Sequence, residues 1–230
     1  MKNILLIGGS YGIGSAIAQQ LSQDTNVIIA SRSNESIPTG ATYLEYDATT
    51  DSITDLDLPE VIDGLVYCPG SINLKPFSML KSEAFEKDLQ INFLSLVQIL
   101  KDLHPKLKAS EQASVVVFST VAVKVGMPFH TSVAAAKGAL EGFSKSLAAE
   151  WAPTIRVNVI APSLTDTPLA KRLLGNETKK EKMNERHPLK RVGEVEDIAN
   201  MATFLLSEKS SWMTGQILGV DGGMSTLNLN

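Results

Sequence analysis

The chain has 230 residues, of which 43% are hydrophobic and 20% are charged, a composition typical of one folded domain and not of a disordered chain. Its net charge of −4 and the absence of any basic run argue against a nucleic acid partner. Because the lone Cys68 permits no internal disulfide, and no apolar run is long enough for a signal peptide or a membrane span, we expect a cytoplasmic protein that enters no membrane.

The first stretch of the chain predicts a strand, a glycine-rich turn and a helix. An apolar run at residues 4–7 leads into Gly8-Gly9-Ser10-Tyr11-Gly12-Ile13-Gly14, and apolar residues then recur at helical spacing. Such a turn brings backbone N–H groups at a helix N-terminus close to a phosphate, where the helix dipole also favours negative charge. Glycine turns also join strands to helices that bind nothing, but here a second strand follows at the spacing of a βαβ unit. The stretch therefore predicts a dinucleotide-binding cradle.

Short stretches rich in valine and isoleucine predict strands along the whole chain. They are Asn3–Gly8, Asn26–Ala30, Ala41–Tyr46, Gly64–Cys68, Ser114–Ser119, Ile155–Ile160 and Gln216–Val220. Most lack polar alternation, so we expect parallel strands that are buried on both faces. Right-handed crossovers then predict an α/β fold, a doubly wound Rossmann-type sheet of about seven mainly parallel strands with helices on both faces. No repeat or linker interrupts the pattern, so residues 1–230 are predicted to form a single domain.

Two long predicted helices have more apolar or small-residue surface than packing against one sheet would bury. Glu83–Leu103, with Ser82 as its predicted N-cap, has apolar residues nearly all round, and Ser132–Trp151 is dense in alanine and glycine. These faces predict a subunit interface, and hence a homodimer or homotetramer, although burial in a monomer core explains them equally well. A shorter helix, Glu194–Leu206, has one apolar face.

Between Pro162 and Arg191 the periodic pattern breaks down, and basic residues mix with acidic ones. The stretch follows the C-terminal end of a predicted strand, where ligands bind in open α/β sheets. We interpret it as a mobile lid over the ligand site. A solvated helical excursion is an equal alternative, and the two interpretations are compatible.

Dispersed motifs follow one another in order along nearly the whole chain. They are the glycine turn at residues 8–14, Asp47 after the third strand, Tyr67-Cys68-Pro69-Gly70, Asn92, Lys137, Ala161-Pro162-Ser163, Thr167, Thr214-Gly215-Gln216 and Val220-Asp221-Gly222-Gly223. Together they resemble the short-chain dehydrogenase/reductase family. The chain departs from the family at three places. Ile7 stands where threonine is common, the NNAG motif keeps only its last residue, Gly70, and Ser163 replaces the glycine of the PG turn.

The resemblance implies a role for each matching residue. The pyrophosphate would lie on the glycine turn, the adenine against Asp47, the ribose on Lys137 and the nicotinamide carboxamide on Thr167, and Gly70 would also belong to the cofactor site. Thr120 would hold the substrate oxygen, and Asn92 would order a water network with Lys137. The residues of the turn that would contact the pyrophosphate are Gly8, Ser10, Gly12, Ile13 and Gly14.

The end of the second predicted strand bears on cofactor choice. It reads Ala30-Ser31-Arg32-Ser33, without the carboxylate that usually holds the ribose hydroxyls of NAD. Arg32 and the neighbouring hydroxyls, including that of Ser31, can instead grip a 2′-phosphate by charge-assisted hydrogen bonds. The pattern predicts a preference for NADP(H), and the alternative is that Arg32 is a surface cation.

The catalytic stretch departs from the family. A family tyrosine, four residues before the lysine, protonates the substrate oxygen, because the ammonium lowers the pKa of the phenol. Counting back from Lys137 reaches Val133, which has no proton to give, and no tyrosine follows Tyr67. His130 lies seven residues before Lys137, a spacing similar to that of divergent enoyl reductases of the family, and histidine titrates near neutrality.

Three functions are compatible with this departure. The first, which we predict, is an NADP(H)-dependent oxidoreductase acting on a small carbonyl or conjugated enone, with His130 as the candidate acid. An ordinary loop histidine is the alternative for His130, and Thr131, Ser132 or a Lys137-bound water are other donors. The second is a dinucleotide-binding sensor or subunit without turnover. The third is a non-redox lyase or isomerase. No metal site is predicted.

Overall fold

A computed structural model of the protein describes residues 1–21 and 25–228. Its centre is one parallel sheet with the strand order β3-β2-β1-β4-β5-β6-β7. The strands are β1 (Lys2–Ile7), β2 (Thr25–Ser31), β3 (Thr42–Glu45), β4 (Gly64–Tyr67), β5 (Ala113–Phe118), β6 (Ile155–Pro162) and β7 (Ile217–Val220). The predicted doubly wound sheet is confirmed, and its predicted strand boundaries shift by only one or two residues.

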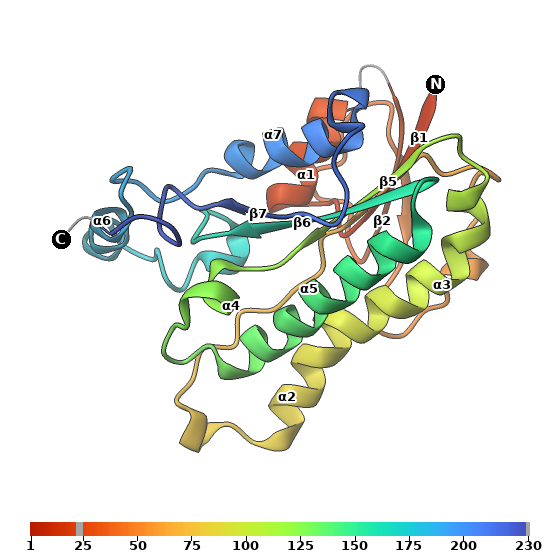
Figure 1. Ribbon diagram of the computed structural model, residues 1–230. Coiled ribbons are helices and arrows are strands. Elements are labelled where there is room, and N and C mark those ends of the chain that lie inside the picture. The colour runs from red at the N-terminus through yellow and green to blue at the C-terminus, as the bar shows by residue number, and fades with distance from the viewer. Residues whose placement is uncertain (22–24, 229–230) are drawn as a thin grey trace.

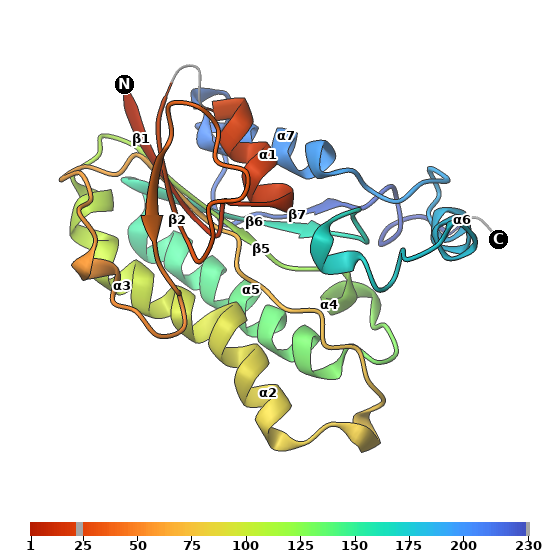
Figure 2. The same cartoon turned by 180° about the vertical axis from the view of Figure 1, so that it is seen from behind.

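Helices cover both faces of this sheet (Figures 1 and 2). On one face lie α1 (Gly12–Leu21) and α7 (Val195–Leu206), and on the other lie α2 (Ser82–Leu89), the π-helix η3 (Gln90–Leu94), α3 (Ser95–Lys108) and α5 (Thr131–Trp151). Two clusters of buried hydrophobic side chains lie between the sheet and its two helical layers. The central strands are buried on both faces, which explains why their sequences lack polar alternation.

Short elements complete the chain. They are α4 (Val121–Val125), α6 (Glu177–Arg186) and the 3₁₀ turns η1 (Ile53–Asp55), η2 (Phe77–Met79), η4 (Pro168–Ala170) and η5 (Glu208–Ser210). The irregular stretch 162–191 thus contains η4 and α6, and α6 buries none of its residues. The predicted helical excursion is therefore present, whereas the mobility of this stretch stays a prediction.

The first long helix differs from its prediction at both ends. Ser82 is the first residue of α2 and not its N-cap, because the chain is still extended at Lys81, which occupies the cap position without a side-chain bond. The helix also continues past Leu103 to Lys108, although Pro105 removes one N–H donor. Leu107 is completely buried against the core, so packing compensates for the missing hydrogen bond.

The strand order places a crevice between β1 and β4. After β1 the chain adds β2 and β3 on one side of it. It then crosses back and adds β4 to β7 on the other side, so the order of the strands reverses at the pair β1 and β4. Ligands of open α/β sheets bind at such a reversal, outside the carboxyl ends of the strands. Here the glycine turn follows β1, and the segment from Cys68 to Gly70 follows β4.

Candidate active site

A cavity of about 720 Å³ runs along the C-terminal ends of the strands. It extends from the loop after β2, past the glycine turn, to the loops that follow β5 and β6. Every residue that the sequence assigns to the site lines it except Asn92. These residues are Gly8, Ser10, Gly12, Ile13, Gly14, Ser31, Arg32, Asp47, Gly70, Thr120, His130, Lys137 and Thr167.

The turn after β1 requires glycine for two different reasons. Gly8 and Gly12 have φ angles of 80° and 57°, in the left-handed region that side chains disfavour. A Cβ atom at Gly14 would lie 2.5 Å from the carbonyl oxygen of Gly8, so the turn packs directly on the start of α1. Because α1 begins at Gly12, its first backbone N–H groups lack partners within the helix and are available to a phosphate.

Hydroxyl groups tie the glycine turn to the loop after β2. Ser10 Oγ lies 3.1 Å from Ser33 Oγ, and Ser31 Oγ donates to the Ser33 carbonyl at 2.8 Å. The Tyr43 hydroxyl donates to the Ser31 carbonyl at 3.0 Å. The backbone at the end of β2 is therefore held in place beside the turn, and its hydroxyls line one end of the cavity.

Arg32 and Asp47 lie together at this end. The Arg32 side chain is 67% exposed, and its Nη1 is 4.0 Å from Asp47 Oδ2, a distance at which an exposed ion pair contributes little. Hydrogen bonds from the Thr49 hydroxyl and backbone N–H, with a smaller contribution from Arg32, lower the pKa of Asp47. Arg32 is thus a loosely held cation at the mouth of the cavity, where an anionic ligand can engage it.

Lys137 is a buried cation in the middle of the cavity wall. Burial lowers the pKa of its ammonium group to about 8, so most of the charge is retained near neutral pH. The neighbouring Cys68 does not balance this charge, because burial raises the pKa of its thiol to about 12. A Cβ at Gly70 would lie 3.7 Å from Lys137 Nζ, so the loop after β4 passes directly beside the ammonium.

Asn92 lies behind Gly70 and not on the cavity wall. It belongs to the π-helix η3, and its Nδ2 donates to Ser71 Oγ and to the Asp88 carbonyl, both at 2.8 Å. Its Oδ1 is buried, has no hydrogen-bond partner among the described residues, and would lie 3.3 Å from a Cβ at Gly70. The amide is therefore held with a free acceptor on the side of Gly70 that also faces Lys137.

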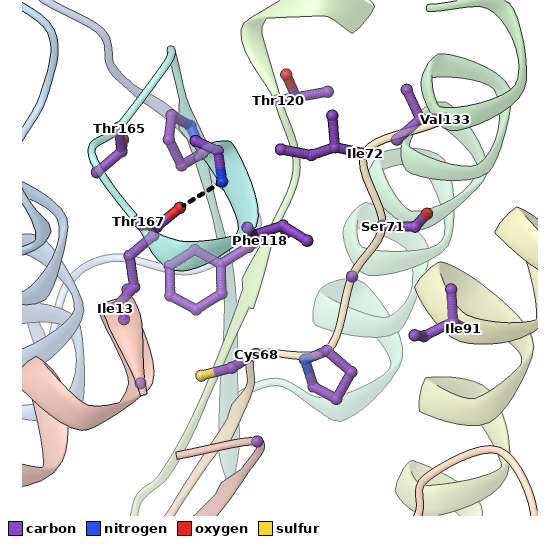
Figure 3. A pocket seen from close by; sticks show the side chains of 18 of the residues that line it. Ile13, Cys68, Ser71, Ile72, Ile91, Phe118, Thr120, Val133, Thr165 and Thr167 are labelled. Carbon is purple, nitrogen blue, oxygen red and sulfur yellow. Dashed lines mark hydrogen bonds between the residues drawn. The ribbon is translucent and has the colours of Figure 1, made fainter. Parts of the chain in front are cut away.

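Thr120 and Val133 both line the cavity. Thr120 Oγ accepts the Ala122 N–H at 3.3 Å as the N-cap of α4, so its own hydrogen is free to donate. Val133 is only 6% exposed and lines the cavity together with Ile72. Figure 3 shows Val133 and Ile72 on the same side of the cavity as Thr120. This part of the cavity combines an apolar wall with the hydroxyl donor of Thr120.

His130 lies at the edge of the cavity, just before α5. Its Nδ1 is 2.7 Å from the Pro128 carbonyl, so Nδ1 carries a hydrogen. The neutral ring then has only an acceptor at Nε2, and the imidazolium form is needed for Nε2 to donate. His130 is partly exposed to solvent, which is typical of the loop histidine considered as its alternative.

The stretch after β6 reaches back to the glycine turn. Thr167 Oγ accepts the Ala170 N–H at 3.2 Å and caps η4, the bond dashed in Figure 3. A Cβ at Gly12 would lie 3.8 Å from Thr167 Cβ, so Thr167 borders the cradle. Residues of this stretch therefore line one side of the cavity, as the lid interpretation requires, and their mobility stays a prediction.

Two polar arrangements were missed in the sequence. Ser163 Oγ lies 2.8 Å from His187 Nε2, and Ser71 Oγ donates to Asp88 Oδ1 at 2.6 Å. A signal existed for the first, because a serine stands where the related turn has glycine. We find no signal for the second, since nothing in the sequence separates Asp88 from the exposed acids of the same helix.

Comparison with known proteins decides the family. A family model described as Enoyl-(Acyl carrier protein) reductase matches residues 8–225. A tropinone reductase homologue of Arabidopsis thaliana is 33% identical over 243 residues, which cover 97% of this chain and 92% of the relative. A short chain dehydrogenase family protein from Francisella tularensis has a TM-score of 0.92 at 28% identity, covering 99% of this chain and 100% of the other. The chain belongs to the short-chain dehydrogenase/reductase family.

Another solved structure of similar shape is a variant of ElxO with NADPH bound. It has a TM-score of 0.86 at 26% identity, and the match covers 98% of this chain and 99% of ElxO. This short-chain dehydrogenase/reductase is therefore an oxidoreductase by family, with a cavity that suits a nicotinamide dinucleotide. The close approach at Gly14 and the free Asn92 Oδ1 beside Lys137 fit such a group.

Across residues 1–21 and 25–228, no group of three or more His, Cys, Asp or Glu side chains is placed to hold a metal ion. In the same ranges no helix has the length and apolar character that crossing a membrane demands.

Proposed function

We propose that this protein is an NADP(H)-dependent oxidoreductase that acts on a small carbonyl or conjugated enone. The observation that carries the proposal is the continuity of one cavity. It joins a cation that suits a 2′-phosphate, a glycine turn that suits a pyrophosphate, a buried ammonium and a hydroxyl donor on an apolar wall. A bound nicotinamide dinucleotide supplies the hydride, and the protein positions it.

Each residue of the cavity then has a role. The first amides of α1 and the hydroxyl of Ser10 hold the pyrophosphate, and Asp47 and Gly70 border the adenosine half. The ammonium of Lys137 holds the ribose hydroxyls, and Thr167 holds the carboxamide. Thr120 donates a hydrogen bond to the substrate oxygen, which gains negative charge as the hydride is transferred. The apolar wall excludes water from that oxygen.

The choice of NADP(H) over NAD(H) rests on Arg32. Its guanidinium is exposed at the cavity mouth, beside the hydroxyls of Ser31 and Ser33, and ElxO, the similar protein mentioned above, binds NADPH. We expect Arg32→Asp to lose about 2 kcal/mol of charge-assisted hydrogen bonding to the 2′-phosphate, roughly a thirtyfold loss of preference for NADPH over NADH. Parallel fluorescence titrations with both nucleotides measure this ratio.

The matched control is Lys209→Asp, which makes the same change of charge at an exposed site outside the cavity. Its preference should equal that of the wild type. An unchanged ratio in Arg32→Asp would show that Arg32 is only a surface cation.

The proton donor is the open part of the proposal. We propose that Val133 occupies the position of the family's tyrosine and that another group acts instead. Val133→Tyr is expected to raise kcat for a ketone by about 100-fold, since a phenol one helical turn before Lys137 is lowered in pKa by its charge. Val133→Phe is the control, because it adds the ring without the hydroxyl. Equal rates in the two variants would contradict a site otherwise complete for carbonyl reduction.

One experiment separates the candidate functions. Purified protein is mixed with NADPH under anaerobic conditions and then with a panel of ketones, aldehydes and enones, while nucleotide absorbance is followed. Oxidation of NADPH by a panel member supports the proposed activity. Tight binding without oxidation favours the sensor or subunit, and conversion of an unsaturated compound without nucleotide oxidation favours a lyase or isomerase. His130→Ala tests the candidate acid, which would be eliminated if turnover persisted.

Two wider expectations accompany this function. Leu94 of η3 and Phe77 of η2 are 48% and 70% exposed, and Phe85 of α2 is half-buried. A homodimer or homotetramer through these helices, with a cytoplasmic location, therefore stays our proposal.

A further inference from the structure

A buried serine–histidine pair lies beside the proposed site of reduction. Ser163 Oγ is 2.8 Å from His187 Nε2, and His187 Nδ1 is 2.8 Å from the Met183 carbonyl oxygen. Because a carbonyl only accepts, Nδ1 carries a hydrogen in every protonation state. In the neutral ring Nε2 accepts the Ser163 hydroxyl hydrogen. In the imidazolium Nε2 donates to Ser163 Oγ, and the hydroxyl hydrogen is released to donate elsewhere.

The released hydroxyl borders the substrate part of the cavity. Both Ser163 and His187 line the cavity that contains Thr120. Strands β5 and β6 are neighbours that pair in register up to Phe118 and Ile160, so Thr120 follows the end of one strand and Pro162 ends the other. Ser163 is the next residue, and its hydroxyl therefore starts from the strand end adjacent to the one that carries Thr120.

The imidazole is buried, hydrogen-bonded at both nitrogens and bordered by a second cavity. His187 is 2% exposed, and its backbone N–H donates to the Asn184 carbonyl at 3.1 Å. A separate cavity of about 210 Å³ also touches Ser163 and His187, and it is large enough for several water molecules. The pair thus lines both cavities, the larger one that contains Thr120 and the smaller one that can hold water.

The charged groups around this pair come from several elements. Arg186 lines the larger cavity beside His187, and Arg191, Asp197 and Asp221 line the smaller one. Arg191 and Asp197 neutralise each other in an ion pair, and Asp221 accepts backbone N–H groups from residues 223 and 225. None of these side chains forms a hydrogen bond to the imidazole, whose two nitrogens bond to Ser163 and to the Met183 carbonyl.

We propose that Ser163 is the catalytic proton donor of this protein and that His187 is the positioning residue that returns a proton to the Ser163 hydroxyl. The inference rests on the proposed oxidoreductase function. The carbonyl carbon gains a C–H bond and two electrons from the hydride of a reduced nicotinamide dinucleotide, which becomes oxidised. The carbonyl oxygen takes the Ser163 hydroxyl proton, and the O–H bond of an alcohol forms. Ser163 Oγ takes the proton of His187 Nε2. Because Nδ1 already carries a hydrogen, the neutral imidazole regains its proton at Nε2, and bulk solvent supplies that proton by exchange through the cavities that both residues line.

The pair is tested first without turnover. The chain has three histidines, so ¹⁵N-histidine NMR resolves each ring in the intact protein. We expect His187 in its neutral state to carry the hydrogen on Nδ1, and Ser163→Ala to change its Nε2 shift and its titration midpoint. His104, which stacks on Trp151 outside the cavity, is the internal control and should not respond. A His187 titration unchanged by Ser163→Ala would overturn the relay, whatever the protein catalyses.

Turnover is then tested with 4-nitrobenzaldehyde and NADPH. Ser163→Ala and His187→Gln are each expected to lower kcat about 100-fold with little change in KM, as for loss of a general acid. Ser163→Thr, which keeps the hydroxyl, should recover most of the rate. Because the relay needs the imidazolium form of His187, the wild-type kcat should fall as the pH is raised, and His187→Gln should lack this dependence.

The outcomes distinguish the relay from the proposed function. Wild-type turnover that survives both substitutions, or an unchanged pH profile in His187→Gln, overturns the relay and leaves the oxidoreductase in place. A wild-type protein that binds no NADPH, or binds it and reduces no carbonyl, overturns the proposed function and with it the catalytic role of Ser163. A merely structural pair would lower stability without removing the pH dependence.

Discussion

Gly14→Ala is expected to lose about 2 kcal/mol of stability and to bind NADPH at least roughly tenfold more weakly than the wild type. The added Cβ would lie 2.5 Å from the Gly8 carbonyl oxygen, 2.9 Å from Gly9 Cα and 3.1 Å from Cys68 Sγ. The two nearest atoms belong to the backbone of the glycine turn, so relief requires a change in the turn that we propose as the pyrophosphate site. Urea unfolding and a fluorescence titration with NADPH measure the two effects.

Gly138→Ala is the matched control for this prediction. Gly138 is also helical, but the nearest heavy atom to its added Cβ would be Val123 Cγ1 at 3.8 Å, an ordinary contact. In the interior of α5 the change should stabilise the helix by about 0.5–1 kcal/mol and leave NADPH binding unaltered. If Gly14→Ala bound NADPH as tightly as Gly138→Ala, the glycine turn would not be the cradle.

Lys137→Met is expected to make the free protein more stable near neutral pH by roughly 1–3 kcal/mol while weakening NADPH binding. Burial lowers the pKa of Lys137 from 10.5 to about 8, so the folded state keeps this ammonium charged against a desolvation cost. Methionine has a similar length and no charge to desolvate, but it offers nothing to the ribose hydroxyls. Stability and binding should therefore change in opposite directions.

The stability difference between the wild type and Lys137→Met should depend on pH. Below about pH 8 the lysine is charged in both folded and unfolded chains, so its destabilising contribution is complete. Between about pH 8 and pH 10.5 the unfolded chain binds more protons, so wild-type stability should gain on that of Lys137→Met and the difference should disappear. Lys145→Met, on the exposed side of the same helix, is the control. A constant difference across this range would show that desolvation is not its cause.

The sheet and the cradle were predictable from local patterns. Strands that are buried on both faces need apolar residues at every position, so they appear in the sequence as uninterrupted apolar runs. A turn that has no room for a Cβ atom needs glycine, so it appears as a glycine cluster. The long helix was less predictable at its ends. Its continuation past Pro105 depends on the burial of Leu107, which is a property of the packed core and not of the helix itself.

Proton chemistry was the least predictable part of the site. The sequence showed that Val133 cannot donate a proton, and it led us to His130 by spacing along the chain. The structure leaves His130 partly exposed and buries His187 instead, 24 residues from its partner Ser163. Such a pair has no periodicity or spacing that a linear pattern can register.

The sequence by itself determined that the chain folds as a doubly wound α/β domain, that it has a glycine cradle and that no tyrosine precedes Lys137 by one turn. These features follow from residue type and spacing, because secondary structure and close approach constrain each position locally. Only the tertiary structure decided that Asn92 lies behind the cavity wall, that Lys137 is desolvated and that Ser163 meets His187. Burial and hydrogen-bond geometry arise from segments that pack together after folding, so they depend on the whole chain at once.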